Sequence, residues 1–112
     1  MTYITKRDRE TIRLIEAVIN EVTGYDKDYY LDMDRMSLSD RIMRYAWIYE
    51  VYSRTMLDQI QLSETMGRNQ SNISRAIANA EQWIKRPKNK YHKQLKNIHN
   101  EIERRILERG DL

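Results

Sequence analysis

The chain contains no cysteine, and this absence excludes disulfide bonds, thiol catalysis and cysteine-ligated zinc sites. It has only one proline and three glycines among 112 residues, so residues that break helices are few. No apolar run reaches the roughly 18 residues that a membrane-spanning helix needs. Residues 1–8 also lack the apolar segment of a signal peptide. We therefore expect a protein of the cytoplasm or nucleoid, without a membrane partner.

The composition suits a small helical protein with long solvated faces. Apolar residues make up 40% of the chain and charged residues 33%. A chain of this length is the size of one domain and can bury one modest core. We predict an all-α fold, a compact helical bundle of about five helices with a long C-terminal helix. The single domain would cover residues 1–112, with its core at about 6–106.

The net charge of +3 is unevenly distributed along the chain. Residues 1–66 hold nine Lys or Arg and twelve Asp or Glu, and residues 100–112 hold three and four. Residues 67–99 hold eight basic residues and one acid, which gives this segment a charge of +7. Positive charge is thus concentrated in one segment, as in proteins that bind nucleic acids.

Apolar residues recur at helical spacing in five segments. The expected helices are residues 6–23, about 39–53, 57–66, about 70–84 and about 89–109. Thr5 is suited to cap the first helix and Gly24 to end it, while Ser39-Asp40 would cap the second and Gly110 would close the last. Residues 25–38 have no sustained period, so we expect a loop that can include a short helical turn.

The apolar stripes also predict which side chains point into the core. In the first helix these are Ile12, Ile15, Val18, Ile19 and Val22; in the third they are Leu57, Ile60 and Met66, with Leu62 near them. The second helix would be buried through Met43, Ala46, Trp47 and Val51, the fourth through Ile73, Ala76, Ile77, Ala80 and Ile84, and the fifth through Tyr91, Leu95, Ile98, Ile102 and Ile106.

Residues 62–76, LSETMGRNQSNISRA, have the pattern of a helix-turn-helix. The pattern has a helix, a tight turn at Gly67 and a second helix that opens near Gln70. Gly67 suits a turn residue with positive φ. Packing between the two helices is assigned to Leu62, Met66 and Ile73.

Polar and basic side chains occupy the first turns of the second of these helices. The candidate contacts to bases and nearby backbone are Arg68, Asn69, Gln70, Ser71, Asn72, Ser74 and Arg75. Asn and Gln can pair with adenine, Arg can bind guanine or phosphate, and Ser can bind either. No acid lies between Gly67 and Ala80. The following basic run adds phosphate contacts, assigned to Lys85, Arg86, Lys88 and Lys90. We predict sequence-specific binding of double-stranded DNA, with residues 70–84 as the recognition helix in the major groove.

Three short stretches resemble a known family. They are Arg44-Tyr45-Ala46, Leu62-Ser63-Glu64-Thr65-Met66-Gly67 and Arg68-Asn69-Gln70-Ser71-Asn72-Ile73. With them, residues 9–106 resemble the C-terminal DNA-binding domain (domain IV) of the bacterial chromosomal replication initiator DnaA. The resemblance implies a Trp-repressor-like helical fold, with residues 68–72 facing the major groove or the nearby backbone. It also implies a basic loop that reaches the minor groove, for which the candidates are Arg35, Arg41 and Arg44.

The chain departs from that family at residues 67–70, in the turn and at the start of the second helix of the motif. Asn69-Gln70 replaces the family's Asp-His, and one residue is missing between Gly67 and Arg68. The donors and acceptors offered to base edges therefore differ, and so would the target sequence. The chain also has no Walker motif. We expect a stand-alone DnaA-domain-IV-like protein that acts in replication-origin binding or its regulation.

Nothing in the sequence indicates an enzyme, a cofactor or a small-molecule substrate. His92 and His99 lie seven residues apart, and Glu103 follows four later, which is not the spacing of a zinc protease site. We expect both histidines to be solvated or to face phosphate, and no metal to bind. The alternative function is a helical protein-interaction adaptor, or a dimerising transcriptional regulator whose helix-turn-helix serves another site. Residues 89–109 are the candidate homodimer surface.

Overall fold

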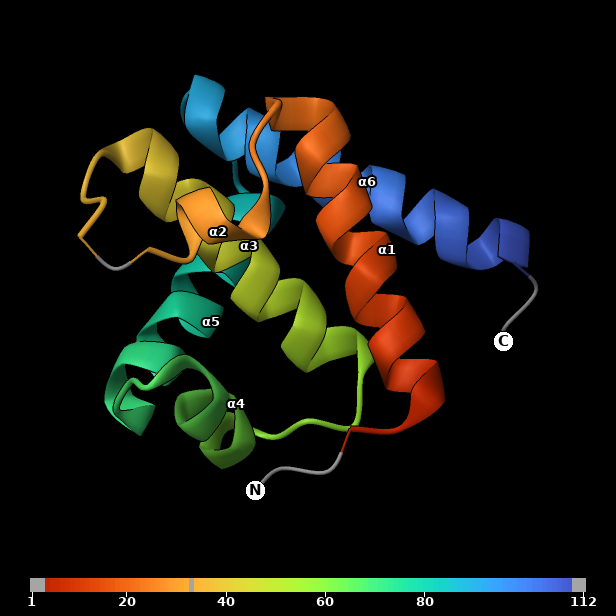
Figure 1. Cartoon of the computed structure of the whole chain (residues 1–112). Coiled ribbons are helices and arrows are strands. Elements are labelled where there is room, and N and C mark those ends of the chain that lie inside the picture. The colour runs from red at the N-terminus through yellow and green to blue at the C-terminus, as the bar shows by residue number, and fades with distance from the viewer. Residues whose placement is uncertain (1–3, 33, 110–112) are drawn as a thin grey trace.

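A computed structural model describes residues 4–32 and 34–109. Within this part the chain forms six α-helices and no strand, so the predicted all-helical fold is confirmed (Figure 1). The helices are α1 (Lys6–Thr23), α2 (Lys27–Tyr30), α3 (Leu38–Arg54), α4 (Gln59–Met66), α5 (Gln70–Lys85) and α6 (Lys90–Arg109). The short α2 is the helical turn that the prediction for residues 25–38 allowed within a loop. None of the six helices is long and apolar enough to cross a membrane.

Helix α3 is the central element of the bundle. It crosses the middle of the molecule and packs against each of the other five helices (Figure 1). Its buried apolar residues are Ile42, Met43, Ala46, Trp47, Ile48 and Val51. Burial of this kind contributes roughly 1.5–3 kcal/mol for each large side chain. The core is therefore organised around α3, and α4 and α5 are oriented by their packing near it.

The ends of α1 follow the local signals in the sequence. The Thr5 hydroxyl accepts a hydrogen bond from the Asp8 backbone N–H at 3.1 Å, as a helix cap does. Gly24 ends the helix in the left-handed conformation, with φ of 84°. Both predictions are confirmed. Gly110, expected to close α6, lies outside the described residues.

The starts of α3 and α4 differ from the predicted positions. The cap of α3 is Ser37, whose hydroxyl accepts from the Asp40 N–H at 3.1 Å, so the prediction of Ser39-Asp40 was wrong by two residues. A cap and the N–H it satisfies are three residues apart, and only Ser37 has this spacing to an acidic first turn. Asp58 caps α4 in a reciprocal arrangement with Gln61, so α4 begins at Gln59 rather than at Leu57.

Two side chains predicted to be buried are exposed. Ile60 is 54% exposed, because it lies two positions from the fully buried Leu62 and therefore on the opposite side of α4. Val22 is 40% exposed and lies at the open edge between α1 and α6, beside Asn97 and Asn100. Helical spacing alone does not show where a neighbouring helix ends.

A buried ion-pair network joins α3 to α6. Glu50 is fully buried and accepts from Arg54 Nε at 2.6 Å and from His99 Nδ1 at 2.7 Å. Arg54 also pairs with Glu103 at 2.8 Å. His99 is thus bound to Glu50, and the expectation that it is solvated or faces phosphate was wrong. In the described part of the chain, no group of three His, Cys, Asp or Glu residues is placed to hold a metal.

The turn between α4 and α5 is built on one glycine. Gly67 has φ of 65° and its N–H donates to the Glu64 carbonyl at 3.3 Å, which confirms the predicted positive φ. The next residue, Arg68, donates its N–H to the Ser63 carbonyl at 2.9 Å. Asn69 then caps α5 through its side chain. The turn is therefore three residues long and places Arg68 directly before the first turn of α5.

We expect Gly67→Ala to destabilise the protein by about 1 kcal/mol, because a Cβ strains the left-handed backbone even though no neighbouring atom blocks it. Gly67→Asn should cost less, since Asn tolerates this conformation better than other non-glycine residues. Urea unfolding followed by circular dichroism would measure both changes. Equal stability of the Ala variant and the parent would show that the turn is not strained.

Candidate nucleic-acid interface

The first turn of α5 is organised by the side chain of Asn69. Its Oδ1 accepts from the Asn72 backbone N–H at 2.9 Å and from the Ser71 hydroxyl at 2.7 Å. The oxygen of this amide is therefore used for capping, while the NH₂ group stays available as a donor. Asn69 thus holds the first turn of α5 in place, and only its NH₂ group remains for contact with a base.

The predicted contact residues of α5 do not all face outward. Gln70, Ser71 and Arg75 are exposed, and Asn72 is half-buried. Ser74 donates its hydroxyl to the Gln59 side chain on α4, so it links the two helices instead of facing a partner. The free polar face of α5 is thus formed by Gln70, Ser71 and Arg75.

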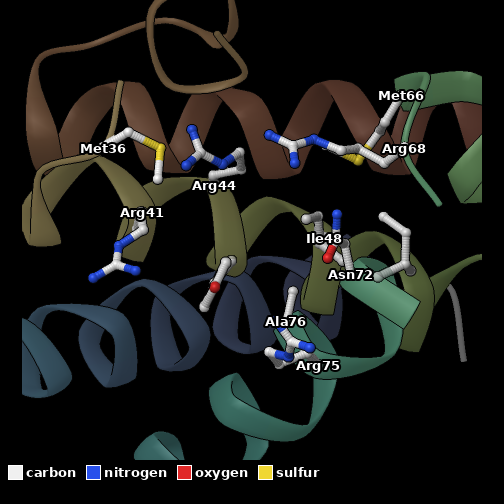
Figure 2. Close-up of a pocket in the computed structure, with 11 residues that line it drawn as sticks. Met36, Arg41, Arg44, Ile48, Met66, Arg68, Asn72, Arg75 and Ala76 are labelled. Carbon is white, nitrogen blue, oxygen red and sulfur yellow. The ribbon is translucent and has the colours of Figure 1, made fainter. Parts of the chain in front are cut away.

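Beside this face lies a hollow of about 320 Å³ that four arginines line. We call it the arginine hollow. Arg41 and Arg44 come from α3, Arg68 from the turn and Arg75 from α5. Figure 2 shows the side chain of Arg68 extending toward Arg44, and Arg41 and Arg75 at other places around the hollow. No carboxylate lines the hollow, so four positive charges share one concave surface.

Three of these four guanidinium groups have no partner in the described part of the chain. The side chains of Arg41, Arg68 and Arg75 form no hydrogen bond and no ion pair there. The Nε atoms of Arg41 and Arg68 are buried and unsatisfied. A buried donor without an acceptor costs roughly 1–3 kcal/mol, so such groups in a native protein call for an explanation.

Arg44 is held inside the molecule by backbone carbonyls. It is only 4% exposed, and its guanidinium donates to the carbonyls of Tyr30 at 3.3 Å, Asp32 at 2.9 Å and Arg35 at 3.1 Å. Burial lowers the pKa of Arg44, and the positive charges of Arg68 and Arg41 lower it further. Arg44 therefore fastens the loop after α2 to α3, and we no longer count it among the minor-groove candidates.

The other two minor-groove candidates are in different places. Arg35 lies on the exposed loop, where its guanidinium is 3.9 Å above the Tyr29 ring and 4.0 Å from an Asp32 oxygen. Tyr29 stacks in turn on Tyr25, with ring centroids 4.2 Å apart. Arg41 lines the arginine hollow instead. Only Arg35 is thus presented on the loop, and it is partly held by its neighbours.

The basic run lies at the far end of α5. Lys85 pairs with Glu81 at 2.9 Å, which neutralises part of its charge. Arg86, Lys88 and Lys90 are exposed, and Lys90 lies 5.2 Å from the centre of the Tyr91 ring. Because α5 has 16 residues, about 24 Å separates the two basic regions along its axis.

A row of stacked rings fixes the basic run against the bundle. Trp83 stacks on Tyr45 at 5.7 Å and on His92 at 4.7 Å between ring centroids. His92 Nδ1 accepts from the Lys88 backbone N–H at 3.1 Å. Burial lowers the pKa of His92, and the charge of Lys88 lowers it further. His92 is therefore a buried structural residue, and the expectation of a solvated or phosphate-facing histidine was wrong.

Comparisons with protein families, with curated proteins and with solved structures find no match for the chain. The resemblance to the DnaA DNA-binding domain stays a prediction that the motif residues alone carry. In the structure Arg44 lies on α3, residues 62–67 form the end of α4 and the start of the turn, residues 68 and 69 complete the turn, and residues 70–72 open α5.

The arginine hollow itself was not predicted from the sequence. The four arginines had been assigned separately, Arg68 and Arg75 to the major groove or backbone, and Arg41 and Arg44 to the minor groove. They are far apart in the chain, and no spacing rule relates them. The excess of basic over acidic residues after Gly67 was the only signal available, and it does not identify a cavity.

We expect Arg44→Met to destabilise the protein by about 2–3 kcal/mol, because three carbonyls lose a charged donor while the side-chain volume is kept. Arg41→Met is the matched control, since the Arg41 side chain makes no hydrogen bond in the described residues, and this variant should be no less stable than the parent. Urea unfolding measures both. Similar losses in the two variants would contradict the role assigned to Arg44.

Proposed function

We propose that the protein binds double-stranded DNA with sequence specificity, using α4, the turn and α5 as a helix-turn-helix. The observation that carries this proposal is the free polar face of α5. Gln70, Ser71 and Arg75 are exposed there, and no acid lies between Gly67 and Ala80. Such a face can approach phosphates and base edges without electrostatic repulsion. A surface for protein contact would not need to lack acidic residues.

The chemistry of this face fits base edges in the major groove. The Gln70 amide can donate to and accept from adenine in a bidentate pair, and Arg75 can bind guanine in the same manner. Ser71 and Arg75 are four residues apart and so share one side of the helix. The N–H groups in the first turn of α5 would add contacts to a phosphate.

We further propose a relation to the DnaA DNA-binding domain and a role at replication origins. The order of the three motif stretches along α3, α4 and α5 supports a Trp-repressor-like arrangement related to the DnaA DNA-binding domain. A role in replication-origin binding or its regulation rests on that resemblance alone. Because Asn69 and Gln70 replace the family's Asp-His, we propose a target sequence different from the family's usual one.

The alternative of a dimerising regulator has one feature in its favour. Leu107 on α6 is 50% exposed and offers a small apolar contact. The rest of the apolar stripe of α6 is used within the molecule, where Leu95, Ile98 and Ile102 are fully buried. α6 thus leaves little apolar surface for a second copy, and DNA binding by a monomer is the stronger proposal.

Binding should weaken steeply with salt. If about five phosphates are neutralised, a plot of log affinity against log salt concentration should have a slope of about −4 to −5. Fluorescence anisotropy with a random 20-base-pair duplex would measure it between 50 and 200 mM sodium chloride, conditions that span a large change in affinity. Arg13→Gln, which removes an exposed charge on α1, should leave the slope unchanged. Absence of binding at the lowest salt would refute the proposal.

Two variants separate base reading from phosphate binding. Once bound duplexes have been selected from a random pool, Gln70→Ala should reduce the preference at one base pair by roughly 1–3 kcal/mol. Lys88→Ala should instead weaken binding to all duplexes alike and make the salt slope shallower by about 1. Competition titrations with point-substituted duplexes would measure both effects. Identical behaviour of the two variants on every duplex would show that the assigned roles are wrong.

A further inference from the structure

The arginine hollow carries positive charge that no acidic side chain in its lining neutralises. Like charges brought together in a partly buried site repel one another, and the repulsion is larger there than in water. A neighbouring carboxylate usually compensates such a charge, but none lines this hollow. The carbonyls that hold Arg44 satisfy its N–H groups without cancelling its charge. Asp40 offsets part of the charge of Arg44 but does not line the hollow, so the surface of the hollow stays positive.

The donors of the hollow suit a tetrahedral oxyanion. Guanidinium groups present several N–H donors in a fixed plane, which matches the oxygens of a phosphate. The guanidinium groups of Arg41 and Arg68 make no hydrogen bond in the described residues and line the hollow, as does Asn72. A volume of about 320 Å³ is at the small end of the range for ligand pockets, so it has room for one phosphate group and some water.

We infer that the arginine hollow is a binding site for a single phosphate group, and that in the DNA complex it holds one backbone phosphate. Arg41 and Arg68 supply the hydrogen bonds, and Arg44 supplies a fixed positive charge. The hollow lies between the first half of α3 and the first turns of α5, which contribute Asn72 and Arg75 to its lining. A phosphate held there would set the register of α5 on the duplex. The assignment to DNA rests on the proposed function, whereas phosphate binding as such does not.

Inorganic phosphate is the first probe. At about ten times its dissociation constant, phosphate should raise the melting temperature by roughly 5 °C relative to sodium chloride of equal ionic strength. In ¹H–¹⁵N spectra, the Nε–H resonances of Arg41 and Arg68 should shift with phosphate and not with chloride. Shifts absent at these two positions, or equal in the two salts, would overturn the inference.

Variants test the site without depending on one substitution. Arg68→Gln should weaken phosphate binding by about tenfold or more, because one charge-assisted donor set is lost. Without phosphate it should melt no lower than the parent, since a repulsion is removed. Arg68→Lys keeps the charge but not the planar donors, and its affinity should lie between those of the other two. Arg13→Gln is the control for charge alone and should bind phosphate as the parent does.

The DNA arm separates this inference from the proposed function. If both are right, Arg68→Gln should weaken binding to every duplex and make the salt slope shallower by about 1, and phosphate should compete with DNA. Phosphate binding with unchanged DNA affinity of Arg68→Gln would overturn the assignment to a DNA phosphate and indicate a free phosphate ligand. If the protein bound DNA but did not respond to phosphate, the inference that the hollow binds phosphate would be wrong, and the proposed function would still stand. Phosphate binding by a protein that binds no DNA would refute the proposed function and the DNA assignment together.

Discussion

The buried guanidinium of Arg44 is the interaction on which the basic side of this molecule depends. A charge in the interior is costly unless hydrogen bonds or an opposite charge compensate it. Here three carbonyls of the segment after α2 accept its hydrogen bonds, no carboxylate lines the hollow beside it, and Asp40 offsets only part of its charge. The same contacts therefore fold that segment onto α3 and leave a positive charge under the surface. The arginine hollow is a consequence of this arrangement, because Arg41, Arg68 and Arg75 surround a charge that the fold has already placed.

Helix α5 connects two regions with different chemistry. Its first turn, capped by Asn69, exposes Gln70, Ser71 and Arg75 beside the hollow. Its last turn leads into the basic run, which the stack of Trp83 on Tyr45 and His92 fastens to α3 and α6. A rigid helix that is anchored at both ends can present its polar face in one orientation. This rigidity is what a reader of base edges requires, since a bidentate pair tolerates little displacement.

Local signals in the sequence predicted the helices well where the relevant physics is local. Thr5 and Gly67 act through hydrogen bonds and backbone angles within a few residues, and the structure has both as expected. Ser37 was missed because Ser39 and Asp40 are also good caps, although only Ser37 lies three residues before the acid of the first turn. Ile60 was assigned to the core because its spacing from Leu57 is helical, but Leu57 precedes α4 and so does not define its inner face. His92 and His99 were predicted to be solvated because histidine is polar. Their partners, Trp83 and Glu50, lie on other helices, so the sequence around each histidine does not show them.

The helices, the glycine turn at residue 67 and the polar, acid-free stretch after it could be predicted from the sequence, because they depend on residues that are close in the chain. Which of the basic residues lie together could not be predicted, because it depends on how the helices pack. Electrostatic interaction depends on distance in space, and Arg41, Arg44, Arg68 and Arg75 become neighbours only when α3 and α5 pack. Arg44 and Ser74 also do not face a partner molecule, because each is hydrogen-bonded inside the protein to a group that no local sequence pattern identifies.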